Sequence, residues 1–358
     1  MQKQAIEFNQ FGLKMYLLTL TIEELVNNSY VNIFNSETGE GYQRPVSPTH
    51  YKKITKYFRD EETPILPPTI LAAIDKEDIT FSNNTLIIND SLRLVDGQHR
   101  IEALKYLKQI NNSRYNELKH VEMPVTLLSI ENSQEIHEVN TFIDINSKGK
   151  KVSTDLAIRL RDKLRNHAGY YKTHKDLIEA IATKVALFLN NEDKVSVWYG
   201  AIKTGPEVKG TIISINAFCR SLSSIIEKIV ETNVIDYKQI SVENVNDIVE
   251  SISKIVNEIW DTIRNNWDDC FEKSIPMFKK GYNLQKGTGT YSIHLLFNEC
   301  LEKKEGNKEK AMVLFKEYIK MSGVESEDWL TGGNFSGYSS ESGFRYIANE
   351  IKKKALVQ

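Results

Sequence analysis

The stretch that decides the fold is residues 92–104, which read LRLVDGQHRIEAL. Its first four residues alternate as in a strand, and Asp96 and Gly97 are typical turn residues. From Gln98 onward the apolar residues follow the helical period. We therefore expect a strand, a glycine turn and a helix that begins at Gln98.

The start of this expected helix is suited to bind an anion. The first backbone N–H groups of a helix lack intrahelical partners, and the helix dipole favours negative charge there. Arg100 lies in the first turn, where its guanidinium group can reach the same anion, above all a phosphate. Asp96 would lie beside the anion, suited to a ribose hydroxyl or a magnesium ion. An ordinary connection, with Asp96 as N-cap and with His99 and Arg100 in solvent, explains the same residues.

Residues 96–100, Asp-Gly-Gln-His-Arg, are followed by Ile-Glu-Ala-Leu, and together they resemble the DGQHR signature of the DndB-type proteins. They are also similar to the Gly-x-x-Arg box of the ParB/sulfiredoxin superfamily. The resemblance spans residues 12–165 and implies a mixed-sheet domain whose box binds nucleotide phosphates. In the DndB group the box is linked to ATP hydrolysis and to DNA-modification systems, which implies a DNA-modification or anti-phage defence setting.

Two further positions match the ParB-like pattern. Arg44, just ahead of an expected helix, resembles the arginine before the first helix of those domains, and the resemblance implies a role for it in phosphate binding. Asn146 falls at the asparagine of an acid-Asn-x-x-Arg box that helps to hold metal and phosphates. A loop arginine, for Arg44, and a loop between two helices, for Asn146, are the ordinary explanations of these residues.

The chain departs from that second box on both sides of Asn146. Ile145 replaces the acid, so Asp144 is the expected stand-in as a magnesium ligand, and Lys148 or Gly149 replaces the arginine. We expect Lys148 to contact phosphate in its place. The departure puts both the nucleotide chosen and the metal geometry in question.

Composition limits the classes of function. The chain has 358 residues, which favours two domains, and its net charge of −2 argues against coating nucleic acid by bulk charge. Its three cysteines are far apart and form no C-x-x-C pattern, which fits a reduced cytoplasm. The sequence shows no signal-peptide core and no uncharged apolar run of membrane-spanning length. We expect a cytoplasmic protein without a membrane partner.

A basic segment supplies the local charge that contact with DNA would need. Residues 148–176 hold nine basic and three acidic residues. A helix capped at Ser153 or Thr154 would place its arginines and lysines in two exposed rows, which suits a nucleic-acid backbone. A solvated helix face is the ordinary explanation. The candidate DNA contacts are Lys150, Lys151, Arg159, Arg161, Lys163 and Arg165.

The remaining pattern completes the fold prediction. Residues 85–88 and 92–95 are expected to form a β-hairpin, and apolar residues at helical spacing dominate from residue 177 onward. His294 on one of these helices is expected in the core. We predict an α+β protein, with a ParB/sulfiredoxin-like mixed-sheet domain at residues 12–150. A mostly helical domain at residues 151–358 follows, with a possible role in binding DNA or a partner.

Three functions fit this prediction. In the first, a DNA-associated nucleotide hydrolase, amides at Gly97, Gln98 and His99 hold the phosphates of ATP or another nucleoside triphosphate. There Arg100 neutralises charge, His99 orients water, and Asp96 or Asp144 binds Mg²⁺. The second is a DNA-binding transcriptional regulator without hydrolysis. The third is a nickase that uses Asp96, His99 and Glu102. Sulfiredoxin-like thiol chemistry is disfavoured because Gln98, not cysteine, precedes His99. The sequence leaves a homo-oligomer open.

Overall fold

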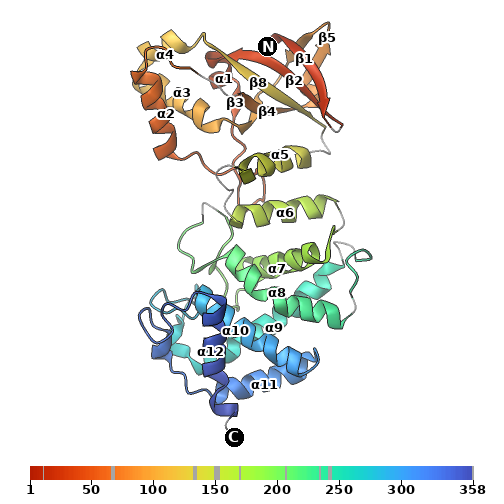
Figure 1. The fold of residues 1–358 in the computed structure, drawn as a ribbon, viewed down its shortest axis with the longest axis vertical. Coiled ribbons are helices and arrows are strands. Elements are labelled where there is room, and N and C mark those ends of the chain that lie inside the picture. The colour runs from red at the N-terminus through yellow and green to blue at the C-terminus, as the bar shows by residue number, and fades with distance from the viewer. Residues whose placement is uncertain are drawn as a thin grey trace. The chain divides into compact units, whose positions relative to one another are not determined.

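The computed structural model divides into two compact units, Met1–Val152 and Ser153–Gln358, and each is described by itself. It describes residues 1–10, 12–65, 69–131, 135–148, 154–168, 171–205, 208–233, 235–240 and 244–356. Among these, the side chains of residues 135–136, 144–148, 154, 164, 167–168 and 356 are left out of the description. The first unit is built on a sheet and the second on helices (Figure 1). The predicted α+β class is confirmed.

The first unit is organised around one eight-stranded sheet with the order β3-β7-β4-β8-β2-β1-β6-β5. Strand β4 runs parallel to β8, and β3 runs parallel to β7, while the other neighbours are antiparallel. The sheet is therefore mixed, as predicted. The strands are β1 (Gln2–Gln10), β2 (Leu13–Thr21), β3 (Ser29–Tyr30), β4 (Ile70–Asp75), β5 (Ile79–Ser82), β6 (Thr85–Ile88), β7 (Leu92–Asp96) and β8 (Glu122–Ile130).

Helices α1 to α4 pack together on this sheet (Figure 1). Helix α3 buries Ile101, Leu104 and Leu107 against it, because residues three and four apart share one face of a helix. This confirms the strand–glycine–helix expected around Gly97. The helices of the unit are α1 (Ile22–Asn27), α2 (Pro48–Asp60), α3 (Gln98–Ile110), α4 (Asn112–Leu118) and α5 (Glu135–Lys148).

The predicted hairpin between β6 and β7 is wrong. Strand β6 pairs with β1 and β5, whereas β7 pairs with β3 and β4 in the other half of the sheet. The tight turn lies one strand earlier, at Asn83 and Asn84, whose φ angles are 50° and 58°. Asparagine tolerates this left-handed conformation, and two such residues in succession suit a two-residue hairpin. The Asn-Asn pair was therefore the stronger hairpin signal.

The second unit is a helical assembly around a large apolar core. Its core includes four fully buried tryptophans, Trp198, Trp260, Trp267 and Trp329. Strands β9 (Ile202–Lys203) and β10 (Ile213–Ser214) form a short parallel pair. The helices are α6 (Thr154–Ala168), α7 (His174–Asn191), α8 (Ile215–Thr232), α9 (Val245–Asn266), α10 (Gly287–Lys303), α11 (Lys308–Lys320) and α12 (Glu341–Lys352). Short 3₁₀ segments span Lys76–Asp78, Asp268–Cys270, Ser326–Trp329 and Lys354–Leu356.

The three cysteines all lie buried in the helical unit. Burial raises the pKa of the Cys219 thiol, and it raises the pKa of Cys270 and of Cys300 to about 12. A thiol is reactive as its thiolate, so these groups are inert in the folded unit. Separately, no helix within the described ranges is both long and apolar enough to cross a membrane.

Candidate functional site

The loop between β7 and α3 has room for glycine alone at its centre. Gly97 is the N-cap of α3 and adopts a φ of +98°, a conformation that side chains disfavour. A Cβ atom at this position would lie 2.4 Å from Cδ1 of Ile70. Glycine therefore lets the chain turn tightly against β4, and Asp96 is not the N-cap that the ordinary explanation requires.

The first turn of α3 leaves part of its backbone open. The amides of Arg100 and Ile101 both donate to the carbonyl oxygen of Gly97, at 2.9 and 3.2 Å. The amide of Gln98 makes no hydrogen bond to another described residue. An open N–H at the positive end of a 13-residue helix is the feature that binds anions.

The Arg100 side chain holds the loop together instead of extending into solvent. It is 17% exposed, its Nη2 donates to the carbonyl oxygen of Thr69 at 3.2 Å, and it lies 3.7 Å from Oδ2 of Asp96. Burial lowers the pKa of Arg100, and the charge of Asp96 opposes this effect. The Asp96 side chain is 49% exposed, so its carboxylate stays accessible.

A second histidine, which sequence reasoning missed, lies at this loop. His50, exposed in the first turn of α2, has its ring centroid 4.4 Å from that of half-buried His99. Helices α2 and α3 pack together, which brings these two residues side by side although 49 positions separate them. The available signal was the Ser47-Pro48 pair, because a serine followed by proline is typical of a helix start and would place His50 in the first turn.

Arg44 follows a residue that is fixed against β7. The Gln43 side chain is buried, and its Nε2 donates to the carbonyl oxygen of Leu94. Arg44 itself is half-buried. The structure thus anchors the segment that carries Arg44 beside the strand that leads to Gly97.

Helix α5 is anchored to the same strand by a buried charge network. Glu138 is fully buried, accepts a hydrogen bond from the Tyr42 hydroxyl at 2.6 Å, and pairs with Nε of Arg93 at 2.9 Å. Arg93 also pairs with Asp75 at 2.7 Å. Burial and then Glu138 raise the pKa of Tyr42; burial lowers that of Arg93, but Asp75 and Glu138 more than offset it. The network holds α5 against β7, and no local sequence pattern predicts it.

The second predicted box lies at the end of α5. Asp144, Asn146 and Lys148 belong to this helix, and not to the loop that was the alternative explanation of Asn146. Their side chains lie outside the described residues, as do Lys150 and Lys151 entirely.

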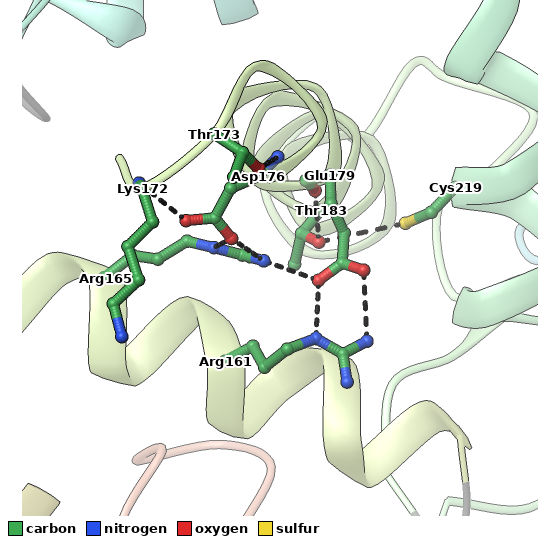
Figure 2. Close-up of polar contacts among 8 residues, drawn as sticks. All are labelled: Arg161, Arg165, Lys172, Thr173, Asp176, Glu179, Thr183 and Cys219. Atoms are coloured by element: carbon green, nitrogen blue, oxygen red, sulfur yellow. Dashed lines mark hydrogen bonds and ion pairs between the residues drawn. The ribbon is translucent and has the colours of Figure 1, made fainter. Parts of the chain in front are cut away.

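Two of the predicted DNA contacts form ion pairs inside the helical unit. Figure 2 shows Arg161 and Arg165 of α6 pointing at Asp176 and Glu179 of α7. Arg161 pairs with Glu179 at 2.7 Å, and Arg165 reaches Asp176 at 2.6 Å and Glu179 at 2.7 Å. Arg165 is only 6% exposed. Burial lowers its pKa, but hydrogen bonds with Glu179 and Asp176 more than offset this, so the pKa is raised.

The rest of the basic segment differs in exposure. Arg159 and Lys163 are half-buried on α6, whereas Lys172, just before α7, and Lys175, in its first turn, are exposed. Arg165 was expected in an exposed row, but its side chain is buried and faces the acidic residues of α7.

The comparisons with known proteins place the chain in a class associated with DNA sulfur modification. The model of the DndB family, described as DNA-sulfur modification-associated, matches residues 4–329. The match covers most of the chain, which therefore belongs to the DndB family and has a role in DNA sulfur modification. No curated protein and no solved structure matches it. The likeness to the ParB/sulfiredoxin superfamily stays a prediction.

Proposed function

We propose that this DndB-family protein is a DNA-associated nucleotide hydrolase, an ATPase, that regulates a DNA-modification or anti-phage defence system. The observation that carries the proposal is the arrangement at the start of α3. There an open Gln98 amide, the half-exposed Asp96 and the adjoining rings of His50 and His99 surround one glycine turn. Backbone donors, imidazoles and a carboxylate are the groups that phosphoryl transfer uses.

The phosphates of the nucleotide would bind at the amides that begin α3. The helix dipole adds positive potential there, and the Arg100 guanidinium, fixed by Thr69, adds a permanent charge beside it. Because Thr69 and Asp96 already hold Arg100, its charge is preorganised and needs no rearrangement when charge develops on the phosphoryl group.

Asp96 fits a magnesium ion that arrives with the nucleotide. Mg²⁺ is usually held by one or two carboxylates together with substrate phosphates. Within the described ranges, no group of three or more His, Cys, Asp or Glu residues could hold a metal ion alone. Asp96 would thus supply one ligand, and the bound ion would neutralise phosphate charge. Asp144 remains the second proposed ligand.

The imidazoles of His50 and His99 would take part in proton transfer from the attacking water. Histidine changes its charge near neutral pH, so a neutral ring nitrogen of His99 can accept a proton from the attacking water. His50, whose ring adjoins that of His99, would orient the same water or donate to a phosphate oxygen. The DNA contact would come from two exposed lysines, Lys172 just before α7 and Lys175 in its first turn.

The experiment is a screen of the four ribonucleoside triphosphates for phosphate release, with and without duplex DNA. We expect His99→Ala and Asp96→Asn to lower kcat by about 100-fold, the usual contribution of a positioned acid or base. His120→Ala, an exposed histidine at another position of the same unit, is the matched control and should leave kcat unchanged. The absence of hydrolysis under all conditions, or equal rates in all variants, would refute the proposal.

One observation favours the DNA-binding regulator as second candidate. Arg100 is already bonded to Thr69 and Asp96, an arrangement that equally suits a static grip on a DNA phosphate. In that case Arg100→Ala would weaken DNA binding and reduce its salt dependence, and neither form would release phosphate.

A further inference from the structure

A helix covers one part of a sheet face in the first unit and leaves an apolar part of the same face exposed. This α5 face is the side of the sheet away from the core shared with helices α1 to α4, and α5 contacts it at β7 and β8. Arg93 of β7 lies on it, because its side chain pairs with Glu138 of α5. Ala73, the partner of Arg93 on β4, and Leu128, the partner of Ala73 on β8, are fully buried there.

The strand register extends the α5 face to β2 and β1. Leu128 is paired with Met15, and Met15 is paired with Phe8. Residues paired across neighbouring strands share a face, and alternate residues along a strand return to it. Leu17 and Ile6, each two residues from this row, are therefore also on the α5 face, where they are paired with each other. Four apolar side chains thus form two cross-strand pairs.

This part of the α5 face is open. Ile6 is 66% exposed and Leu17 is 41% exposed, while Phe8 and Met15 are half-buried. Ile87 of β6, also 41% exposed, adds another apolar side chain, because its pairing with β1 places it on the same face. Exposed apolar side chains that adjoin one another mark an interaction surface.

The same part of the face carries no charged side chain. Strands β1, β2, β5 and β6 contain three charged residues, Lys3, Glu7 and Lys14. All three alternate with residues of the α5 face and so lie on the other side. There Lys3 pairs with Glu24 of α1 at 2.7 Å, and Lys14 pairs with Glu7 at 3.2 Å. A solvated sheet face normally carries the polar residues of its strands, so this distribution of charge is reversed.

The absence of charge on this surface indicates what covers it. DNA and anionic lipids are bound through cations, and a strongly charged protein partner needs opposite charges. Contact between two identical copies places one surface against itself across a two-fold axis, so a charge near the axis would meet a like charge. An uncharged surface avoids this repulsion, which favours a second copy of this chain.

The size of the surface fits a weak dimer. Neighbouring strands lie about 4.8 Å apart and a nine-residue strand is about 30 Å long, so β1, β2 and the shorter β6 and β5 give an outline of roughly 400 Å². Because side chains make the accessible area larger than the outline, two copies would bury roughly 1,000 Å², the lower limit for a specific interface. We therefore expect a dissociation constant in the micromolar range.

We propose that the exposed part of the α5 face, defined by Ile6, Phe8, Met15, Leu17 and Ile87, is the interface of a reversible homodimer. The two sheets pack face to face, and the paired apolar side chains of one copy interdigitate with those of the other. The inference goes beyond nucleotide hydrolysis, and it depends on no residue of the loop between β7 and α3.

The test is sedimentation velocity of the full-length protein at concentrations from about 1 to about 100 µM. The wild type should change from monomer to dimer across this range. Ile6→Lys should raise the dissociation constant of the dimer at least about tenfold, because each copy then buries a charge against its like. Ile33→Lys is the matched control and should leave the constant unchanged, because Ile33 is 47% exposed but lies between β3 and α2, outside this face. Thermal melts establish that both variants fold.

Ile6→Glu adds a test that a loss of folding cannot imitate. Alone it should associate as weakly as Ile6→Lys, whereas a mixture of the two variants should associate more tightly than either, since opposite charges then meet. A wild type that is monomeric at every concentration, a dimer that Ile6→Lys leaves unchanged, or a mixture no tighter than its components would overturn the proposal. Phosphate release by the same variants reports separately on the function proposed for the Gly97 loop.

Discussion

Two histidine environments of this protein differ in almost every physical respect. His294, on α10, is 1% exposed, and Nε1 of Trp260 donates to its Nε2 at 3.0 Å. Because a tryptophan N–H can only donate, Nε2 carries no proton, so Nδ1–H donates to Oγ of Ser221 at 2.8 Å. Ser221 in turn donates to the carbonyl oxygen of Phe218 at 2.7 Å. Every polar atom of the His294 ring is thus satisfied.

The pair at the Gly97 loop has the opposite character. His50 is exposed and His99 half-buried, and their rings adjoin at the open start of a helix. Burial lowers the pKa of His294 to about 3, so that ring stays neutral at physiological pH. Solvent access and unsatisfied neighbouring groups, and not the residue type, therefore distinguish a candidate catalytic histidine from a structural one.

The largest expected effect on stability comes from removing the hydrogen bonds of buried His294. His294→Phe keeps a ring of similar size but removes the acceptor for Trp260 and the donor for Ser221. The Trp260 N–H then lacks an acceptor and Ser221 Oγ loses the hydrogen bond that it accepts, although Ser221 still donates to Phe218; this should lower the free energy of unfolding of the helical unit by about 3 kcal/mol. Urea denaturation followed by tryptophan fluorescence measures this. His50→Phe is the control and should change stability by less than about 0.5 kcal/mol; equal losses would remove the contrast.

The next effect is a dependence on pH. The folded pKa of His294 is about 3 and the unfolded value is 6.5, so below pH 6.5 the unfolded state binds a proton that the folded state excludes. Stability from this group is complete above pH 6.5 and is lost as the pH falls toward 3. Between pH 7 and pH 5 the loss should be about 2 kcal/mol. Measuring the free energy of unfolding of the wild type and of His294→Phe between pH 7 and pH 5 isolates the contribution of His294. A difference between the two proteins that stays constant with pH would contradict the lowered pKa of His294.

The smallest expected effect on stability concerns the Gly97 loop. Gly97→Ala forces a side chain into a left-handed conformation and against Ile70, and should destabilise the sheet unit by about 1–2 kcal/mol. Gly12→Ala is the matched control, because Gly12 has a φ of +86° and nothing within 4 Å of the added Cβ. Chemical denaturation should therefore show the larger loss at Gly97. The same loss at both positions would mean that the approach to Ile70 plays no part.

The sequence predicted the parts of the fold and site that depend on local pattern. The strand, glycine turn and helix around Gly97 followed from a change of period within thirteen residues. The partners of β7 did not, because strand pairing depends on residues far along the chain; the expected hairpin failed for this reason.

Side-chain environments were harder to predict than elements. Helical spacing placed Arg165 correctly on α6, but spacing alone does not reveal that Asp176 and Glu179 of the next helix bury it (Figure 2). The contact between His50 and His99 likewise depends on how α2 packs against α3. In both cases the missing information is which helix faces lie against each other.

The positions of the three cysteines make thiol alkylation a probe of the helical unit alone. Cys219, Cys270 and Cys300 all belong to the helical unit, and the sheet unit has no cysteine. Since burial suppresses their thiolates, an alkylating reagent can modify them only during transient opening. The labelling rate therefore reports transient opening of the helical unit alone, and a ligand confined to the Gly97 loop should leave that rate unchanged.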